Sequence, residues 1–290
     1  MNADKAGQRL NYCVDGVEFY MRLAPSAVFP TGIDDSGTAE VDTPFWIAET
    51  PVTYELWYTV RQWALRNGYI FANPGREGSH GSNGQRPTCR REEPVTRFLW
   101  SDGIVWANAL SERMACDPVY TYQENVIRDS TDSRSCHNAV QGLSNGFRMP
   151  TSKEWELAAR YIGVNRPTAG PLKSEVVYRE GLYWTPGNYA SGAAANVDIE
   201  SATHEVAWYG MGHTKNVGLK KANGLGLFDM SGNVWDLCFD RNPLREGDER
   251  VCRGGSWYFC AGGLQVGFFS STSQNNVLSF DGLRLSNALA

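Results

Sequence analysis

The apolar residues of this chain recur at helical spacing in three segments. The first predicts a helix that begins at Thr53 as N-cap and ends near Gly68, with one face made of Leu56, Trp57, Val60 and Ala64. The second predicts a helix after Ser101 that carries Ile104, Ala107, Leu110 and Met114. Each pattern places one apolar stripe against a core and leaves the opposite face polar.

The third segment, PTSKEWELAARYIG, has the clearest start. Thr151 and Glu154 stand at the spacing of a capping box, in which each side chain satisfies a backbone N–H of the other residue. Gly163 is the expected C-terminal cap. The apolar residues between these ends are Trp155, Ala158, Ala159 and Ile162.

Strand-like patterns are short and widely separated, at EFYMRLA, PFWIAET, FRMP and VCRGGSW. Residues 69–94 and 117–147 are rich in Gly, Asn, Ser, Arg and Pro, which is typical of surface insertions, and residues 163–226 hold few periodic segments. The chain is therefore expected to form one α+β domain over residues 18–290, after an N-terminal extension at 1–17. It should contain two to three helices, a small antiparallel sheet and long ordered loops.

Composition agrees with a loop-rich globular protein. Ten Trp and thirty Gly among 290 residues indicate large rings that hold irregular backbone against a small core. The net charge of −5 and pI near 5.5 argue against nucleic-acid binding, which needs clustered Lys and Arg. No run of about 18 apolar residues occurs, so we expect no membrane-spanning segment. The polar start MNADKAGQRLNYC lacks an apolar signal region.

No set of catalytic residue types stands out. Cys136 and His137 are sequence neighbours, which rarely face each other as nucleophile and base. The seven Cys are odd in number and form no CxxC pair, which excludes a complete disulfide framework. Asn233 and Asp236, in NGLGLFDMSGNVWDL, offer oxygen ligands to Ca²⁺, but such a site needs about six to eight oxygens. Turn chemistry is the preferred interpretation, and Ca²⁺ stays an open alternative.

The C-terminal segment, residues 253–286, differs from the rest of the chain. Between Arg253 and Asp281 it has no charged side chain, and Tyr, Phe, Cys, Gly, Ser and Asn are mixed without a period. One interpretation is a buried hairpin, because burial excludes charge. The other is a binding surface, because aromatic rings among small polar residues are typical of paratopes, whereas a core strand favours Val, Ile and Leu.

Five motifs, in this order, resemble those of formylglycine-generating-enzyme-like domains. They are PFWIAETPVTYELW, PVTRFLWSDGIVWANALSER, FRMPTSKEWELAAR, NGLGLFDMSGNVWDL, and VCRGGSW followed by GLRL, and they extend from about residue 18 to 286. The resemblance implies a C-type-lectin-like α+β fold with both termini near the small sheet. It also implies a framework role for Gly254, Gly255, Ser256, Trp257 and Arg284.

The enzymes of this family bind copper through two Cys separated by five positions. The resemblance aligns those positions with Phe259 and Leu264, and Cys260 is one position out of register. Cu(I) prefers thiolates, which neither aligned residue offers. We therefore expect the fold without the oxidase chemistry. A copper- and oxygen-dependent oxidase and a degenerate carbohydrate-binding module remain the alternatives.

The C-terminal segment is most similar to the variable proteins of diversity-generating retroelements. In that group, adenine-directed mutation rewrites codons near the C-terminus, and an Asn codon changed at its adenines never yields Lys, Glu, Gln, Met or Trp. Residues 258–290 contain no Lys, Glu, Met or Trp, and Gln only at 265 and 274. They hold two charged residues, where the chain average of 20% would give about seven.

This resemblance implies a non-enzymatic protein, without a cofactor, that presents a diversified surface on a static scaffold. The expected partner is a protein or cell-surface ligand, the expected state a monomer, and the expected location the bacterial surface or the secreted fraction. Scaffold positions inside the segment are Leu264, Val266, Val277, Leu278, Leu283 and Leu285. The predicted ligand-binding positions are Tyr258, Phe259, Cys260, Ala261, Gly262, Gly263, Phe268, Phe269, Ser271, Thr272, Ser273, Asn275, Asn276, Phe280 and Asp281.

Overall fold

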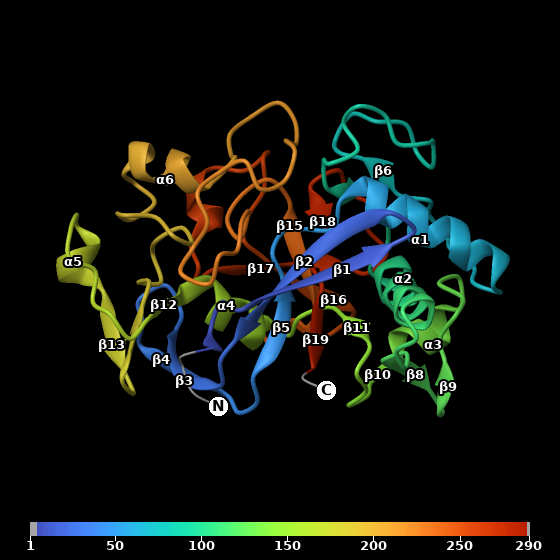
Figure 1. Ribbon diagram of the computed structural model, residues 1–290, viewed down its shortest axis with the longest axis horizontal. Coiled ribbons are helices and arrows are strands. Elements are labelled where there is room, and N and C mark those ends of the chain that lie inside the picture. The colour runs from blue at the N-terminus through green and yellow to red at the C-terminus, as the bar shows by residue number, and fades with distance from the viewer. Residues whose placement is uncertain (1–4, 289–290) are drawn as a thin grey trace.

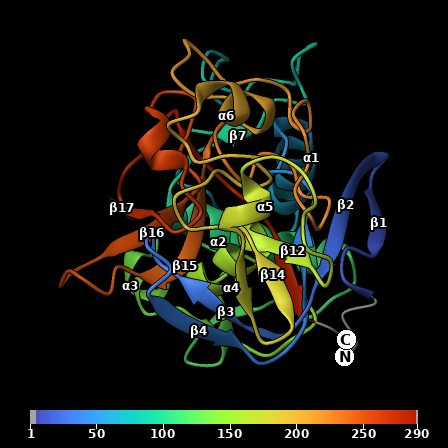
Figure 2. The same ribbon diagram turned by 90° about the vertical axis from the view of Figure 1, so that its left-hand side faces the viewer.

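Strands from both ends of the chain form the largest sheet. The computed structural model describes residues 5–288. The sheet has the order β1-β2-β5-β19-β11 and is antiparallel throughout. Figures 1 and 2 show β1 and β2 side by side. The strands are β1 (Arg9–Val14), β2 (Val17–Ala24), β5 (Phe45–Ala48), β11 (Phe147–Arg148) and β19 (Ser286–Ala288).

Two long helices pack together beside this sheet. Helix α1 (Tyr54–Arg66) begins where the Thr53 hydroxyl accepts a hydrogen bond from Leu56 N, as the sequence predicts. Helix α2 (Trp100–Arg113) begins slightly before the predicted start, because the Asp102 carboxylate accepts from Leu99 N and caps the earlier turn. The indoles of Trp57 and Trp106 stack with centroids 5.3 Å apart and join the two helices.

The capping box of helix α4 (Ser152–Arg160) is present, with Thr151 Oγ1 accepting from Glu154 N and Glu154 accepting from Thr151 N. The predicted end at Gly163 is wrong. Tyr161 adopts extended backbone and pairs with Trp184, so residues 161–163 form strand β12. Sheet pairing therefore overrides the helical pattern in its last turn, and Ile162 lies outside the helix.

A second sheet contains most of the regular structure of the C-terminal segment. Its order is β17-β16-β15-β18, so that β17 and β18 are its two edges. The first three strands are antiparallel neighbours, whereas β18 runs parallel to β15. The four strands are β15 (Trp235–Arg241), β16 (Glu249–Arg253), β17 (Phe269–Ser273) and β18 (Asp281–Gly282).

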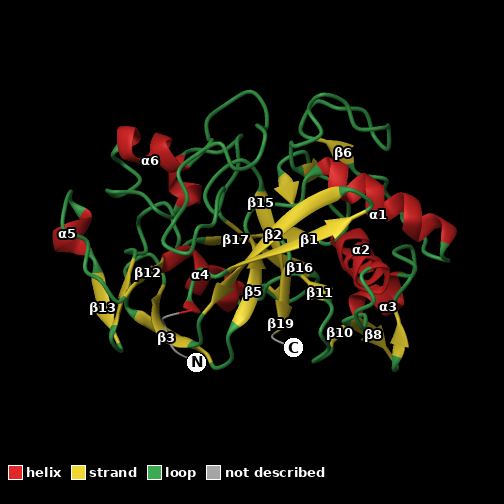
Figure 3. Cartoon of the chain, in the orientation of Figure 1, coloured by secondary structure: helices red, strands yellow, loops and turns green. Residues whose placement is uncertain are grey.

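Short elements and loops make up the remainder (Figure 3). The segments at 69–94 and 117–147 are anchored in the core, since Tyr69 and Tyr120 are buried. Among residues 5–288, no helix combines the length and apolar character needed to cross a membrane. The remaining elements are β3 (Ala27–Thr31), β4 (Gly37–Val41), β6 (Arg76–Glu77), β7 (Val95–Thr96), β8 (Tyr120–Tyr122), β9 (Asn125–Val126), α3 (Ser133–His137), β10 (Val140–Gln141), β12 (Tyr161–Gly163), α5 (Leu172–Glu175), β13 (Val177–Arg179), β14 (Leu182–Trp184), α6 (Glu200–Val206) and the 3-10 turn η2 (Ala261–Leu264).

Candidate ligand-binding surface

Three aromatic rings of the C-terminal segment meet at the molecular surface, and we call Tyr258, Phe259 and Phe280 the aromatic cluster. The rings of Tyr258 and Phe280 are stacked, with centroids 5.9 Å apart and 12° between their planes. Phe259 meets Phe280 edge-on at 5.2 Å. Tyr258 is 62% exposed, Phe259 is 36% exposed and Phe280 is half-buried. The cluster is therefore an apolar patch that remains accessible to solvent.

Hydrogen bonds of the preceding residue, Trp257, hold the backbone that carries Tyr258. Trp257 is buried; its N–H donates to Asn233 O, its carbonyl accepts from Met211 N, and its Nε1 donates to Ser279 O. Gly254 has φ of 91°, and a Cβ at this position would lie 2.6 Å from Met230 O, so only glycine fits. These contacts fix the turn from which Tyr258 projects.

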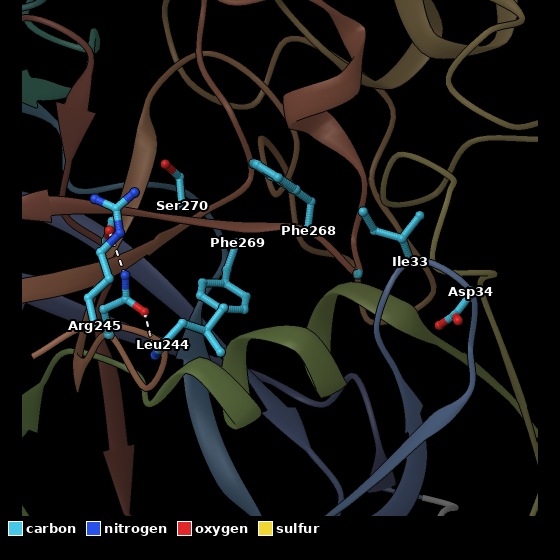
Figure 4. A pocket seen from close by; sticks show the side chains of 10 residues that line it. Ile33, Asp34, Leu244, Arg245, Phe268, Phe269 and Ser270 are labelled. Carbon is cyan, nitrogen blue, oxygen red and sulfur yellow. Dashed lines mark hydrogen bonds between the residues drawn. The ribbon is translucent and has the colours of Figure 1, made fainter.

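A hollow of about 670 Å³ lies beside the edge strand β17. Figure 4 shows Phe268 and Phe269 between Leu244 and Arg245 on one side and Ile33 and Asp34 on the other. The buried Trp235 connects this hollow with the aromatic cluster, since its ring lies 6.3 Å from that of Phe268 and 5.7 Å from that of Phe259. The cluster and the hollow therefore pack on the same buried ring, and together they make up the candidate surface.

Most of the predicted ligand-binding positions reach solvent. Tyr258, Phe259, Cys260, Gly262, Asn275 and Asn276 are exposed. The half-buried positions are Ala261, Gly263, Phe268, Phe269, Ser271, Ser273 and Phe280. The interpretation of the whole segment as a buried hairpin is therefore wrong.

Two predicted positions are buried and do not belong to the surface. Thr272 is 8% exposed, and its hydroxyl accepts from Asn276 Nδ2 at 3.2 Å. Asp281 is 3% exposed, although it lies in the edge strand β18, which pairs with β15. Burial raises the pKa of Asp281 to about 7. The sequence did not separate these residues from their exposed neighbours, because composition does not show which way a side chain points.

The predicted scaffold residues are largely internal. Leu264, Val266, Leu283 and Leu285 are buried, whereas Val277 and Leu278 are half-buried. The five framework residues Gly254, Gly255, Ser256, Trp257 and Arg284 are all buried.

The two calcium candidates are occupied in structural hydrogen bonds. The Asn233 side chain accepts from Lys215 N and donates to Lys215 O, which fastens a neighbouring loop. One oxygen of Asp236 accepts from Arg284 Nε and Trp155 Nε1. Within residues 5–288, no group of three or more His, Cys, Asp and Glu side chains is arranged to hold a metal ion.

Two segments that are distant in sequence from residues 253–286 lie beside the candidate surface, and neither was predicted from the sequence. Gly210 N donates to Phe259 O, which places the loop 208–217 against the aromatic cluster. Arg97 N donates to Leu278 O, which places the end of β7 beside the turn before Phe280. Neither segment has a local motif that signals this position, because the contacts are made between backbone groups.

A small mixed sheet that displays a loop-rich face, together with a sheet formed from both chain ends, defines a C-type-lectin-like domain. The comparisons with known proteins agree, since residues 12–289 match the model of the sulfatase-modifying factor enzyme 1-like domain. The chain belongs to this family, which is the formylglycine-generating-enzyme-like family.

Several known proteins resemble the chain over much of its length. Treponema denticola variable protein 1 superposes with a TM-score of 0.71 at 26% identity, covering 97% of this chain and 99% of that one. The structure of CarF gives a TM-score of 0.70 at 24% identity, with 96% and 99% covered, and so supports the fold alone.

Proteins known from their sequences also match. The inactive C-alpha-formylglycine-generating enzyme 2 of Bos taurus is 31% identical over 177 residues, which are 59% of this chain and 48% of that protein. The chain therefore spans about half the length of that relative. The chaperone protein LppX of Paenibacillus barcinonensis is 28% identical over 221 residues, which are 67% of this chain and 69% of that protein.

Proposed function

We propose that this chain is a non-enzymatic, ligand-binding variable protein of a diversity-generating retroelement. Its recognition surface consists of the aromatic cluster and the hollow beside β17. The observation that carries the proposal is the exposure of Tyr258, 62%, on a turn fastened by the buried Trp257. A rigid turn with solvent-facing side chains is what a surface needs if its residues are to change without loss of the fold.

The chemistry of the surface favours a protein partner. Aromatic anchors gain affinity when a partner removes them from water, at roughly 25 cal/mol per Å² of apolar surface. The adjoining hollow is lined by apolar residues, by the polar groups of Asn242, Ser270 and Ser271, and by the charged side chains of Asp34 and Arg245. Apolar anchors surrounded by adaptable polar groups are typical of protein recognition. We place this recognition at the bacterial cell surface or in the secreted fraction, on the family resemblance.

The residues that align with the copper-binding cysteines of the family argue against oxidase chemistry. Leu264 is buried and Phe259 has no metal-binding atom, so the site of the family's copper-binding cysteines offers no thiolate. Cys260 is a free, exposed thiol in this structure. The Bos taurus relative is itself described as inactive.

Inspection of the source genome tests the retroelement part directly. We expect a near-copy of the 3′ end of the gene, with Asn codons at the surface positions, next to a reverse transcriptase gene. A genome without such a copy would contradict it.

A second experiment tests the rival enzyme. The purified chain is titrated with Cu(I) against a chelator and incubated with a Cys-containing peptide and oxygen. We expect neither a tight stoichiometric copper site nor conversion of the peptide, and either result would establish the oxidase instead. Binding to a glycan array that is lost in the Tyr258→Ser variant would favour the carbohydrate-binding module.

A further inference from the structure

Two arginines lie together on the scaffold next to the candidate surface. Strands β6 and β7 pair so that Arg76 stands opposite Thr96, the residue before Arg97. Both arginines are half-buried, so part of each side chain reaches solvent. Burial lowers the pKa of Arg76, and the positive charge of the nearby Arg97 lowers it further.

Neither arginine is neutralised within residues 5–288. In the part of the chain that the structure describes, the only hydrogen bond of the two guanidinium groups runs from Arg76 Nε to Gly78 O, at 3.1 Å. Arg76 Nη2 and Arg97 Nε are buried and have no hydrogen-bond partner among the described residues. A buried donor without a partner is costly, and two adjacent positive charges add repulsion. Such an arrangement is stabilised when an anion enters.

The neighbouring acidic residues are engaged elsewhere. Glu77 accepts hydrogen bonds from Thr88 N and Oγ1, at 2.7 and 2.6 Å. Glu93 pairs with Arg90 at 2.6 Å and accepts from Thr214 Oγ1. These carboxylates are therefore committed to holding the loops, and the charge of the arginine pair is left for an external group.

The backbone fixes the pair against the C-terminal segment. Arg97 has φ of 59°, a left-handed conformation that is uncommon for residues other than Gly and Asn. Its N–H donates to Leu278 O at 3.0 Å, close to Phe280 of the aromatic cluster. Strained backbone of this kind persists where the surroundings hold it, often at functional sites.

We propose that Arg76 and Arg97 form a constant anion-binding site that receives a carboxylate of the protein partner. Guanidinium groups bind carboxylates through paired, charge-assisted hydrogen bonds, which supply orientation as well as affinity. The inference rests on the proposed function, and adds an anchor that lies outside residues 253–286. The aromatic cluster then selects among partners, while the arginine pair requires an acidic residue at one place in each of them.

The site is tested first with small probes. The chain labelled with ¹⁵N-arginine is titrated with acetate, with the neutral isostere acetamide, and with methyl sulfate. We expect acetate to give saturable shifts of the Nε–Hε signals of Arg76 and Arg97, assigned with Arg76→Gln and Arg97→Asn. Acetamide should give none, and the exposed Arg86 should not respond.

Absence of saturation, or an equal response at Arg86, overturns the site. Tighter binding of methyl sulfate than of acetate overturns the carboxylate assignment in favour of a sulfated ligand. Asparagine accepts the left-handed backbone, so Arg97→Asn should keep the fold, which circular dichroism and thermal unfolding verify.

A random peptide library then tests the anchor in binding. Peptides selected on the wild type should be enriched in Asp or Glu and should bind the Arg76→Gln/Arg97→Asn variant at least tenfold more weakly. The matched control Arg86→Gln removes the same charge and should bind normally. Equal binding to the double variant overturns the anchor and leaves the proposed function intact. If acetate binds but no peptide depends on Tyr258 or Phe259, the proposed recognition surface fails while the arginine site stands.

Discussion

Arg284 Nε donates a hydrogen bond to Asp236 Oδ2 at 2.7 Å, and both side chains are buried. The same oxygen accepts from Trp155 Nε1, and the Arg284 guanidinium also donates to the carbonyls of Ala48 and Phe228. One charged pair thus joins the end of the C-terminal segment to β15, α4 and the first sheet. The scaffold beneath the candidate surface depends on it.

Replacement of Arg284 by Ala should therefore be strongly destabilising. The substitution leaves Asp236 buried without its cation, which costs about 3–5 kcal/mol of the free energy of unfolding. Urea denaturation followed by circular dichroism measures the loss. The control is Arg245→Ala, which removes an exposed ion pair with Glu249 and should change stability by less than about 1 kcal/mol. Equal effects of the two variants would contradict the structural role of Arg284.

The exposed and buried positions of the C-terminal segment should differ in their tolerance to substitution. Tyr258→Ser changes a surface ring and should alter the free energy of unfolding by no more than about 1 kcal/mol. Leu264→Ala empties a buried site and should cost about 2–5 kcal/mol. Urea denaturation followed by circular dichroism measures both changes in the free energy of unfolding. A large loss of stability in Tyr258→Ser would show that this ring supports the fold.

The starts of α1 and α4 could be predicted from the sequence because their signals are local, whereas the short helices α3, α5 and α6 were not predicted. Thr53 and the Thr151–Glu154 pair act on backbone groups within one turn, so residue type and spacing suffice. The end of α4 could not be predicted in this way. Tyr161 leaves the helix to pair with Trp184, a contact that no local pattern encodes.

The candidate surface could be located from the sequence but not resolved into its parts. Absence of charge is shared by exposed binding residues and by core residues, so Tyr258 and Leu264 follow the same compositional rule. The arginine pair and the loop 208–217 were missed because the fold, and not the sequence order, brings them to the segment.

Six of the seven free cysteines should react in two groups, and the seventh, Cys116, is half-buried. Cys13, Cys89 and Cys260 are exposed, whereas Cys136, Cys238 and Cys252 are buried. Burial raises the pKa of Cys136 to about 12 and those of Cys238 and Cys252 well above the ordinary value, so these three stay protonated and shielded.

A thiol reagent at pH 8 should modify the exposed group in the native chain and the buried group only after unfolding. The Cys260→Ser variant identifies the signal from the candidate surface. Fast native modification of Cys238 or Cys252 would contradict the described core.

Asp281 should make the stability of the chain depend on pH. Burial raises its pKa in the folded state from 3.8 to about 7, against an opposing hydrogen bond from Thr272. Between these two values the folded chain keeps a proton that the unfolded chain has lost. The free energy of unfolding contributed by this group therefore falls as pH rises from about 4 to about 7, and is constant above. At about 1.4 kcal/mol per pKa unit, the change amounts to a few kcal/mol.

The Asp281→Asn variant isolates this contribution, because the amide keeps the shape of the carboxyl group and does not ionise. We expect the variant to be more stable than the wild type by about 1–2 kcal/mol at pH 5, and by a few kcal/mol more than that at pH 8, where the full difference in pKa contributes. Asp229, whose pKa burial raises to about 6, acts in the same direction but is present in both chains and cancels in the comparison. Urea denaturation at the two pH values provides the test. A variant whose stability differs from that of the wild type by the same amount at both values would show that Asp281 titrates normally, and would place its carboxylate in contact with water after all.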